Sequence, residues 1–492
     1  NVSTPQVADS GFPGTVTAKD QYNNTVTTDS STVITMTNTG SALFYTSSSY
    51  ATTTDNYTLA SGETAIYMKD TVSETITFSA VDANTKVGTS QSVTIQPEGT
   101  DHYVLTDVAS ITAGGEALYT VTREDKNENL VTAGDEDVTL TSNSTGTYEF
   151  RASSGGPSTT YVTITDGNSS ENFYYYEESA GSWTITVSRG GVTPDTDLLV
   201  VNPDVVDSYT IIADTPQTAG TGFSGTLEGY DQYSNLVTND SSTVVTMSNT
   251  GSADFYTDGG YGTTTDNYTL SSGVAVIYVQ DDVAETITLS AVDANTKVGT
   301  SANIVIDPAG IDYYTVLADT PQTAGVGFQG TVEAYDVYDN LATNDSSTVI
   351  TMTNTGAAAF YTDGGYGTAT DNYTLSSGIA VIYVRDNTAE TITISAVDAN
   401  TKVGTTDNIV IEPAAIDHYV VDADTPQTAG TGFSGTVTAE DQYNNTVTTD
   451  SSTVITMTNT GSADFYTDGG YGTTTDNYTL SSGVAVIYVQ DD

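Results

Sequence analysis

The chain contains no cysteine, only two histidines and a single tryptophan among its 492 residues. Without cysteine, neither disulfide bridges nor thiolate metal sites can form. Nucleophilic catalysis has no evident machinery either, because there is no cysteine nucleophile and no Gly-x-Ser-x-Gly elbow. The two histidines, His102 and His418, stand at the starts of predicted strands, and we interpret them as edge-strand residues. We therefore expect that the protein is not an enzyme.

Basic residues and long apolar runs are also scarce. Ten Lys and Arg residues face 63 Asp and Glu residues, which gives a formal net charge of −53. Such a field repels nucleic acid and anionic membranes and keeps the chain soluble. No stretch approaches about 18 consecutive apolar residues, so we predict no membrane-spanning segment. The acidic excess fits a solvated surface, a saline habitat or the coordination of calcium.

The chain repeats itself with a period of 105 residues. The motif Thr-Pro-Gln-Thr-Ala-Gly begins at Thr215, Thr320 and Thr425, and only 9 of 68 positions differ between Thr215–Asp282 and Thr425–Asp492. A period of about 100 residues is the size of a small domain with its own core. We predict five domains, the second of them divergent, the first without its first strand and the last without its C-terminal strands, as in a window cut from a longer polypeptide: 1–100, 101–206, 207–311, 312–416 and 417–492.

Short alternating segments separated by turns fill each repeat. Phe223–Tyr230 alternates apolar and polar residues with a period of two, which is typical of a strand with one buried face, and Asp231–Asn235 has the composition of a turn. About seven such strands per repeat predict an immunoglobulin-like sandwich. The predicted fold class is all-β, a linear array of Ig-like β-sandwich domains. Because the joints are short and each contains a proline, we expect a semi-rigid, extended array.

One segment carries a resemblance to a known family. Residues 429–448, Ala-Gly-Thr-Gly-Phe-Ser-Gly-Thr-Val-Thr-Ala-Glu-Asp-Gln-Tyr-Asn-Asn-Thr-Val-Thr, resemble a strand and the following turn of the bacterial Ig-like repeats of invasin- and intimin-type surface proteins. The chain departs from that pattern at Asn444 and Ser234, where the family usually has glycine. The resemblance implies an extracellular stalk or adhesive surface, and it does not imply a ligand.

Acidic and amide side chains recur at the predicted domain joints, which suggests calcium. Ca²⁺ needs six to eight oxygen ligands from a flexible loop, and the loops at one end of an Ig sandwich should converge near the incoming joint. The alternative is that Asp and Asn in turns serve the backbone. The predicted Ca²⁺ ligands are Asp281, Asp282, Asp307, Asp312, Asp336, Asn340, Asp386, Asn387, Asp398, Asn400, Glu412, Asp417, Asp441 and Asn445.

The chain is rich in tyrosine, with 33 residues, several of them in one loop of each repeat. Exposed tyrosines can stack on sugars or make contacts between fibres, but they are equally normal at sandwich edges. In the divergent second repeat we predict a ligand site formed by Tyr174, Tyr175, Tyr176 and Trp183. Sequons that permit glycosylation recur at Asn267, Asn372 and Asn477. We do not favour intramolecular Lys–Asn isopeptide bonds, because the recurring lysines lie in turns: Lys86, Lys297 and Lys402.

Three functions remain open at this point. The favoured one is an extracellular structural or adhesive protein, a semi-rigid stalk or fibre on a prokaryotic cell surface. The first alternative is a self-assembling extracellular filament or surface-layer subunit, and the second is a glycan- or receptor-binding adhesin acting through the second repeat. The expected partners are other copies of the chain or a glycan or other partner at a cell surface.

Overall fold

The computed structural model describes residues 1–492, and all of its regular elements are β-strands. It contains no helix of the length and apolarity needed to cross a membrane. The abundance of Thr and Val suits this outcome, because β-branched side chains pack well on a pleated surface. The all-β prediction is confirmed.

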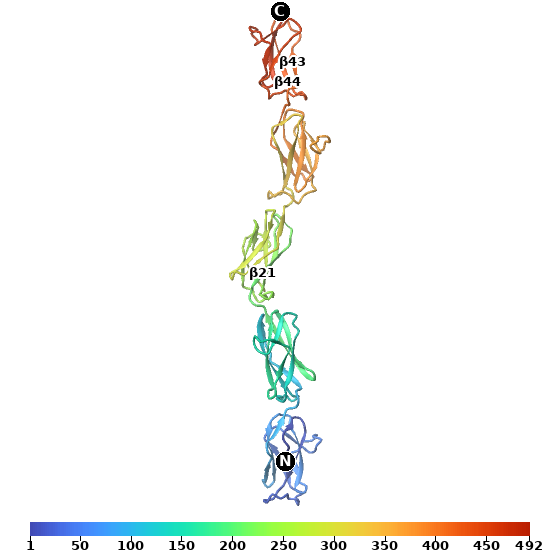
Figure 1. Ribbon diagram of the computed structural model, residues 1–492, viewed down its shortest axis with the longest axis vertical. Helices are drawn as coiled ribbons and strands as arrows, with labels where there is room; N and C mark the ends of the chain where they lie inside the picture. Colours follow the sequence, from blue (N-terminus) through green and yellow to red (C-terminus); the bar gives the residue numbers. More distant parts are fainter. The chain divides into compact units, whose positions relative to one another are not determined.

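The chain divides into two compact units. The first comprises residues 1–209, 228–243 and 269–274, and the second comprises residues 210–227, 244–268 and 275–492. The first two repeats lie in the first unit and the last two in the second, whereas the third repeat contributes residues to both. In Figure 1 the colours follow these repeats along the sequence.

In the first unit, the first repeat contains β1 (Gln6–Val7), β2 (Phe12–Thr17), β3 (Val33–Asn38), β4 (Leu43–Tyr45), β5 (Asn56–Thr58), β6 (Glu63–Lys69), β7 (Thr75–Ile76), β8 (Phe78–Asp82), β9 (Val87–Thr89) and β10 (Val93–Gln96). The second repeat contains β11 (His102–Leu105), β12 (Ser110–Thr112), β13 (Gly115–Glu124), β14 (Glu136–Ser142), β15 (Tyr148–Arg151), β16 (Ser158–Thr159), β17 (Tyr161–Ile164), β18 (Ser170–Glu177), β19 (Gly181–Arg189) and β20 (Val192–Asn202).

The third repeat contains β21 (Ser208–Ala213), β22 (Gln217–Thr218), β23 (Phe223–Tyr230), β24 (Val244–Asn249), β25 (Asp254–Tyr256), β26 (Asn267–Thr269), β27 (Val274–Gln280), β28 (Thr286–Ile287), β29 (Leu289–Asp293), β30 (Val298–Thr300) and β31 (Ile304–Asp307). The fourth contains β32 (Tyr313–Ala318), β33 (Gln322–Thr323), β34 (Gly327–Tyr335), β35 (Val349–Asn354), β36 (Ala359–Tyr361), β37 (Asn372–Thr374), β38 (Ile379–Arg385), β39 (Thr391–Ile392), β40 (Ile394–Asp398), β41 (Val403–Thr405) and β42 (Ile409–Glu412). The fifth contains β43 (His418–Ala423), β44 (Phe433–Glu440), β45 (Val454–Thr456), β46 (Asp464–Tyr466), β47 (Asn477–Thr479) and β48 (Val484–Gln490).

The fourth repeat shows the sandwich in full. One sheet has the strand order β32-β34-β38-β36, the other has the order β37-β35-β40-β41, and β33 pairs parallel to β42 beside them. Side chains alternate as the period-two pattern predicts: Ile382 on β38 is fully buried, whereas its neighbour Val381 is 44% exposed. Ile350 on β35 and Ile382 belong to one core between the two sheets. The prediction of an Ig-like sandwich is confirmed.

The other repeats follow the same plan with local changes. In the fifth repeat β43 and β44 pair in antiparallel fashion and are labelled side by side in Figure 1. In the second repeat β13 and β18 pair from Gly115 to Thr122, and the rings of Tyr119 and Phe173 stack with their centroids 5.3 Å apart in the core. Every sheet joins strands of one repeat only.

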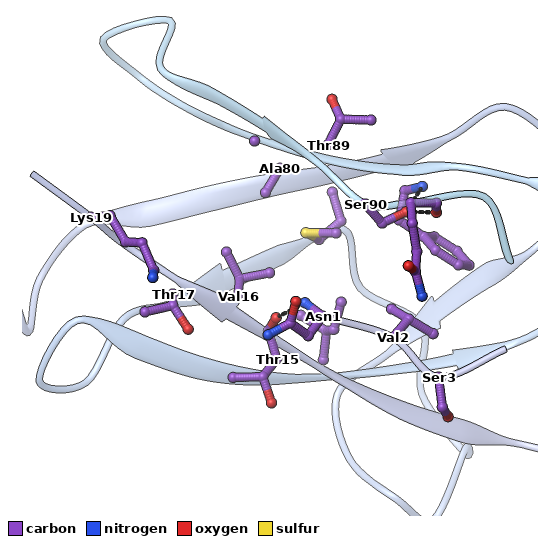
Figure 2. A pocket seen from close by; sticks show the side chains of 15 residues that line it. Asn1, Val2, Ser3, Thr15, Val16, Thr17, Lys19, Ala80, Thr89 and Ser90 are labelled. Atoms are coloured by element: carbon purple, nitrogen blue, oxygen red, sulfur yellow. Dashed lines mark hydrogen bonds between the residues drawn. The ribbon is translucent and has the colours of Figure 1, made fainter. Parts of the chain in front are cut away.

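The first repeat contains a cavity of about 650 Å³ beside β2 (Figure 2). Thr15, Val16 and Thr17 line one wall, and the Asn1 amino group donates a hydrogen bond of 2.5 Å to the Thr15 carbonyl oxygen. In the fourth repeat the corresponding edge of β34 pairs with β32. The cavity therefore lies at the edge of β2 that corresponds to the edge of β34 covered by β32 in the fourth repeat.

Residues 312–416 should fold on their own, because their core is complete within the repeat. In this fragment Ile382→Ala should lower the free energy of unfolding by about 2–5 kcal/mol, since it leaves a cavity in a packed core. Val381→Ala on the exposed face of the same strand is the matched control and should change it by less than about 0.5 kcal/mol. Urea denaturation measures both, and equal losses would contradict the assigned faces.

Candidate functional site at the junctions between repeats

A five-residue turn between an Asp and an Asn begins each junction. In the fourth repeat Asp336 directly follows β34, and its Oδ1 accepts hydrogen bonds from the backbone N–H groups of Tyr338 and Asn340, both 2.9 Å long. Its Oδ2 accepts one from Asn340 Nδ2 (3.0 Å) and one from the N–H of Ala309 (2.9 Å) in the preceding joint. One carboxylate thus holds the turn together and ties it to the joint.

The electrostatics of this carboxylate follow from its surroundings. Burial by itself would raise the pKa of Asp336, but the hydrogen bonds from Asn340 and Ala309 outweigh it and hold the pKa below its usual value. The pKa of the equivalent residue Asp441 is lowered in the same way. The turn also needs a left-handed residue at its fourth position, where Asp339 has φ +66°. Asn444 and Ser234, the residues that replace the family's glycine, adopt the same left-handed conformation.

The asparagine of the turn bridges to the preceding repeat. Asn340 Nδ2 donates to the carbonyl oxygen of Asp282 at 2.8 Å, and its Oδ1 accepts from the N–H of Ala284 at 2.9 Å. A side-chain amide therefore bonds the loop as a neighbouring strand would, with one donor and one acceptor. The same two bonds recur at all four junctions, and we name their residues the junction asparagines: Asn129, Asn235, Asn340 and Asn445.

A tyrosine two residues before the asparagine makes a second contact. A Cβ atom added to Gly220, in the Thr-Ala-Gly turn of the third repeat, would collide with the ring of Tyr338. Only glycine permits this close approach, and Gly220 also has φ +73°, which favours glycine. The same pairing joins Tyr233 to Gly114 and Tyr443 to Gly325.

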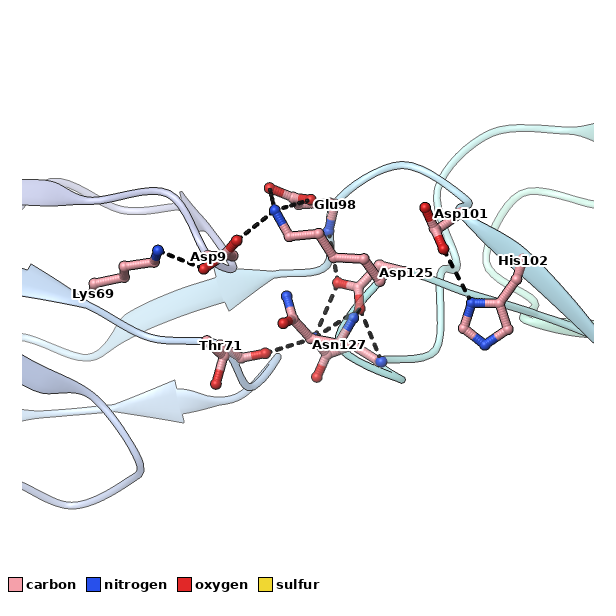
Figure 3. A network of polar contacts seen from close by, with 10 residues as sticks. Asp9, Lys69, Thr71, Glu98, Asp101, His102, Asp125 and Asn127 are labelled. Carbon is pink, nitrogen blue, oxygen red and sulfur yellow. Dashed lines mark hydrogen bonds and ion pairs between the residues drawn. The ribbon is translucent and has the colours of Figure 1, made fainter. Parts of the chain in front are cut away.

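The first junction replaces this contact with ion pairs. Asp9 occupies the position of the glycine, and Asn127 that of the tyrosine. The Asp9 carboxylate pairs with Lys69 at 2.6 Å and with Lys126 of the second repeat, as Figure 3 shows for Asp9 and Lys69. Hydrogen bonds from Lys126 and Lys69 lower the pKa of Asp9. Lys126 also forms an ion pair with Glu98 in the joint. Its positive charge therefore offsets the negative charge of Asp9 across the junction.

Three of the predicted calcium ligands, Asp336, Asn340 and Asn445, lie at these contacts, and their side-chain oxygens have protein partners. Asp336 and Asn340 meet the loop that follows Asp281, as described above, and Asn445 Nδ2 donates to the Asn387 carbonyl oxygen (2.8 Å). The remaining predicted ligands are not gathered with them into a carboxylate cage: nowhere do three or more His, Asp or Glu side chains form a group that could hold a metal ion.

Several of the predicted calcium ligands have other roles. Asp398 Oδ1 accepts from the N–H groups of Asn400 and Lys402, and its Oδ2 accepts from the Tyr314 hydroxyl at 3.1 Å. Asp312 forms an ion pair of 2.5 Å with Lys402. Backbone hydrogen bonds connect others to neighbouring turns or strands, namely Asp307, Glu412 and Asp417. Calcium binding stays a prediction, and the Asp and Asn residues of the turns already serve the backbone.

The aromatic residues of the second repeat do not form one surface. Tyr175 is fully buried, and its hydroxyl donates to Glu177 Oε2 at 2.6 Å. Its assignment as a ligand-binding residue is therefore wrong, because the side chain belongs to the core. Trp183 packs against the same core and donates from Nε1 to the Ser179 carbonyl oxygen at 2.8 Å.

Tyr174 and Tyr176 alternate with the buried positions of β18 and are partly exposed. The guanidinium carbon of Arg151 lies 4.5 Å from the centre of the Tyr176 ring. Ligand binding by these two tyrosines stays a prediction. The sequon asparagines Asn267, Asn372 and Asn477 are exposed, so their glycosylation also stays a prediction.

No known protein-family model matches the chain, and no curated protein sequence matches it. Among solved structures, the adhesin FdeC of Escherichia coli is 16% identical with a TM-score of 0.35, over 64% of this chain and 98% of that chain. InvD of Yersinia pseudotuberculosis is 17% identical with a TM-score of 0.33, over 63% and 96% of the two chains. The D00-D0 domain of intimin is 13% identical with a TM-score of 0.25, over 42% and 98%. Proteins of the invasin and intimin type are thus among the similar structures, and the assignment of the fold rests on the strand pairing described above.

Removal of a junction asparagine should loosen one junction and leave the sandwiches folded. In Asn340→Ala the hydrogen-bond partners on Asp282 and Ala284 are left unpaired, which costs about 1–3 kcal/mol. The Ala284 amide should then exchange its hydrogen at least about tenfold faster. Asn24→Ala is the matched control, because Asn24 occupies the same turn position and bonds only Asp20. Unchanged exchange at Ala284 in Asn340→Ala would contradict the bridge.

Salt should distinguish the first junction from the others. Raising NaCl from about 0.1 M to about 1 M shortens the Debye length from about 10 Å to about 3 Å and weakens the Asp9–Lys126 pair. The Ser73 amide donates a hydrogen bond to Asn129 Oδ1. Its hydrogen exchange should accelerate up to about fivefold. The Ala389 amide, at a junction that uses Tyr443 and Gly325, serves as the control and should not change. Equal acceleration at both amides would show that the ion pair does not hold the first junction.

Proposed function

We propose that the chain is a structural spacer of an extracellular surface protein, a semi-rigid series of sandwiches that holds other parts of the protein away from a prokaryotic cell. The observation that carries the proposal is the recurrence of the two-bond asparagine bridge at all four junctions. Without such bonds, neighbouring domains would reorient freely, as domains within one chain commonly do.

The junction supports stiffness because it uses several independent contacts at once. The asparagine bridge fixes one side of the loop, and the tyrosine–glycine contact fixes a second point on the preceding repeat. The Asp336 carboxylate binds the joint itself through Ala309. Contacts at separate points resist bending as well as twisting. Near-identical repeats also favour a spacer, because length rather than any single repeat then matters.

The same chain properties support the proposed cell-surface location. A formal charge of −53 keeps a long repetitive chain soluble and prevents its association with anionic membranes. The fold needs no disulfides, because the second and fourth repeats each have a core of their own. The resemblance to invasin- and intimin-type repeats in residues 429–448 points to the same location.

Small-angle X-ray scattering tests the spacer function. If each sandwich adds a strand length of about eight residues at about 3.3 Å each, the full chain should have a maximum dimension many times its width. Substitution of all four junction asparagines by Ala should shorten the mean dimension and broaden its distribution. Asn24→Ala, outside any of these junctions, should leave both unchanged. A compact particle in the unmodified chain, or equal profiles for the unmodified and fourfold-substituted chains, would contradict the proposal.

A further inference from the structure

The outward-facing strand positions of one sheet carry no charged side chain. In the fourth repeat this sheet is β37-β35-β40-β41, and its strands alternate between the core and the solvent. The register places the outward side chains of the four strands beside one another in rows. We name these nine residues the neutral face: Val349, Thr351, Thr353, Asn372, Thr374, Ser395, Val397, Val403 and Thr405. Their neutrality is notable in a chain with 63 acidic residues.

The neutral face is the same in repeats that differ elsewhere. The first repeat has identical residues at all nine positions, from Val33 in place of Val349 to Thr89 in place of Thr405, and the third repeat differs only at Ser248.

The outer face of the opposite sheet has changed between the same repeats. Its outward positions on β34, β36 and β38 differ between the first and fourth repeats at seven of ten places, for example Thr17 for Glu333 and Glu63 for Ile379. Folding constrains outward positions only weakly on either sheet. The difference between the two faces therefore indicates that the neutral face contacts something outside its own repeat.

The polar groups of the neutral face are bonded to one another. Thr351 Oγ1 donates a hydrogen bond to Asn372 Oδ1 at 2.9 Å, and the hydroxyl oxygens of Ser395 and Thr405 lie 2.8 Å apart. The same two pairs recur in the first repeat, namely Thr35–Asn56 and Ser79–Thr89. Burying a hydroxyl group costs free energy unless it is hydrogen-bonded. These groups can therefore leave water at a reduced cost.

Valine side chains supply the apolar part of the face. Val349 is 49% exposed and Val403 is 54% exposed. A contact that covers them removes apolar surface from water, which favours association. Small side chains also allow two sheets to pack face to face at the usual distance of about 10 Å.

The chemistry of the face selects the partner. A basic partner would be drawn to the acidic loops rather than to a surface without charge. A sugar would find no aromatic ring on which to stack, because no outward residue of the face is aromatic. A second copy of the chain presents the same small, bonded side chains. Contact between two neutral faces keeps carboxylates out of its centre, where protein interfaces are poor in charge.

We propose that the neutral face is a lateral contact surface between two copies of this chain, packed face to face, so that neighbouring chains associate side by side. Such a contact uses the same patch on both copies, as isologous interfaces do. The inference goes beyond the spacer function, which makes no use of this face.

The second repeat is the exception and should not take part. Asp137, which is exposed on β14, occupies the place that Val349 has on β35, as their threonine partners Thr163 and Thr374 show. The Asp137 carboxylate accepts a hydrogen bond from Thr163 Oγ1 at 2.6 Å. Two such faces would bring like charges together.

The area of one face is too small to hold two copies together. Four strands about 4.8 Å apart and about five residues long cover about 19 Å by about 16 Å, or about 300 Å². A stable interface buries about 800 Å² on each partner, which the faces of the first, third and fourth repeats reach only in sum, at about 900 Å². Association should therefore depend on several faces of one chain, as multivalent binding does.

Salt should strengthen this association. Each copy carries a formal charge of −53, so two copies repel each other at a distance. Raising NaCl from about 0.1 M to about 1 M shortens the Debye length from about 10 Å to about 3 Å and screens that repulsion. A contact made by ion pairs would respond in the opposite direction.

Sedimentation equilibrium of the full chain tests the proposal. The chain is produced without glycans, because Asn372 is also a sequon asparagine and a glycan would cover the face. In about 1 M NaCl the average mass should rise from that of one chain towards that of two between about 1 µM and about 300 µM. Association should be at least about tenfold weaker in about 0.1 M NaCl. A chain that stays monomeric in both salts overturns the proposal.

Variants show whether the neutral face makes the contact. One carboxylate in the centre of each face should weaken the association in about 1 M NaCl at least about tenfold, because a charge is then buried without a partner. The variant combines Thr35→Glu, Thr246→Glu and Thr351→Glu. The matched control makes the same change on the opposite sheet, as Thr15→Glu, Thr226→Glu and Thr331→Glu, and should change the association by less than about twofold. Equal weakening in both variants overturns the proposal, as does association that neither changes.

A second set of substitutions covers the case in which the loss of the Thr351–Asn372 bond unfolds a repeat. Val87→Glu, Val298→Glu and Val403→Glu remove no hydrogen bond, and they should weaken the association to the same extent. Equal urea midpoints for this variant and the unmodified chain show that it is folded. Association that persists in this folded variant overturns the proposal.

A neutral polysaccharide is the competing occupant, and dextran is the probe. Dextran that binds the monomeric chain, and that no longer binds the variant with Glu on the neutral face, would overturn the contact between copies and assign the face to sugars. Absence of dextran binding, together with association that the face variants abolish, supports the contact. The spacer function is tested separately by the scattering of the junction variants, so the two proposals can fail independently.

Discussion

The asparagine side chain that stands in for a backbone peptide group is the interaction on which the junctions depend. An amide carries one acceptor and a donor in the arrangement of a peptide, so Asn340 can satisfy both exposed polar groups of the loop before it. Aspartate in this position would lack the donor, and serine would lack the reach. The Asp336 carboxylate holds the same amide from the other side. Because both partners fix the amide, neither sandwich has to contribute a strand to its neighbour.

The contacts around this amide differ between junctions. The residue in the preceding turn and the residue that faces it change together. Where the preceding turn carries glycine, a tyrosine ring fills the space above it. Where the turn carries Asp9, the tyrosine is absent and Lys126 meets the acid. A mixed set would fail, because a side chain on the glycine would collide with the ring, and Asp9 without Lys126 would keep only Lys69. The junctions therefore differ in chemistry while they share one geometry.

The alternation of apolar residues and the spacing of turns were sufficient to predict the sandwich, because both are local consequences of strand geometry. Only part of the junction could be predicted from the sequence. Asp336 and Asn340 could be recognised as a turn, but their bonds go to backbone groups of another repeat, and no local pattern says which of these point outward. The burial of Tyr175 was predictable: Phe173 and Tyr175 share one face of a period-two strand, and Tyr174 and Tyr176 share the other.

The distribution of charge explains why neutral groups make the contacts between repeats. In a chain with 63 acidic and 10 basic residues, ion pairs of this kind at all four junctions would use most of the basic residues. The first junction uses two of those ten basic residues, Lys69 and Lys126, to neutralise a single Asp9. Amide bridges and tyrosine–glycine contacts need no counter-charge. A divalent cation at Asp336 would have to replace four hydrogen bonds that the carboxylate already accepts, so the structural use of these acids competes directly with metal binding.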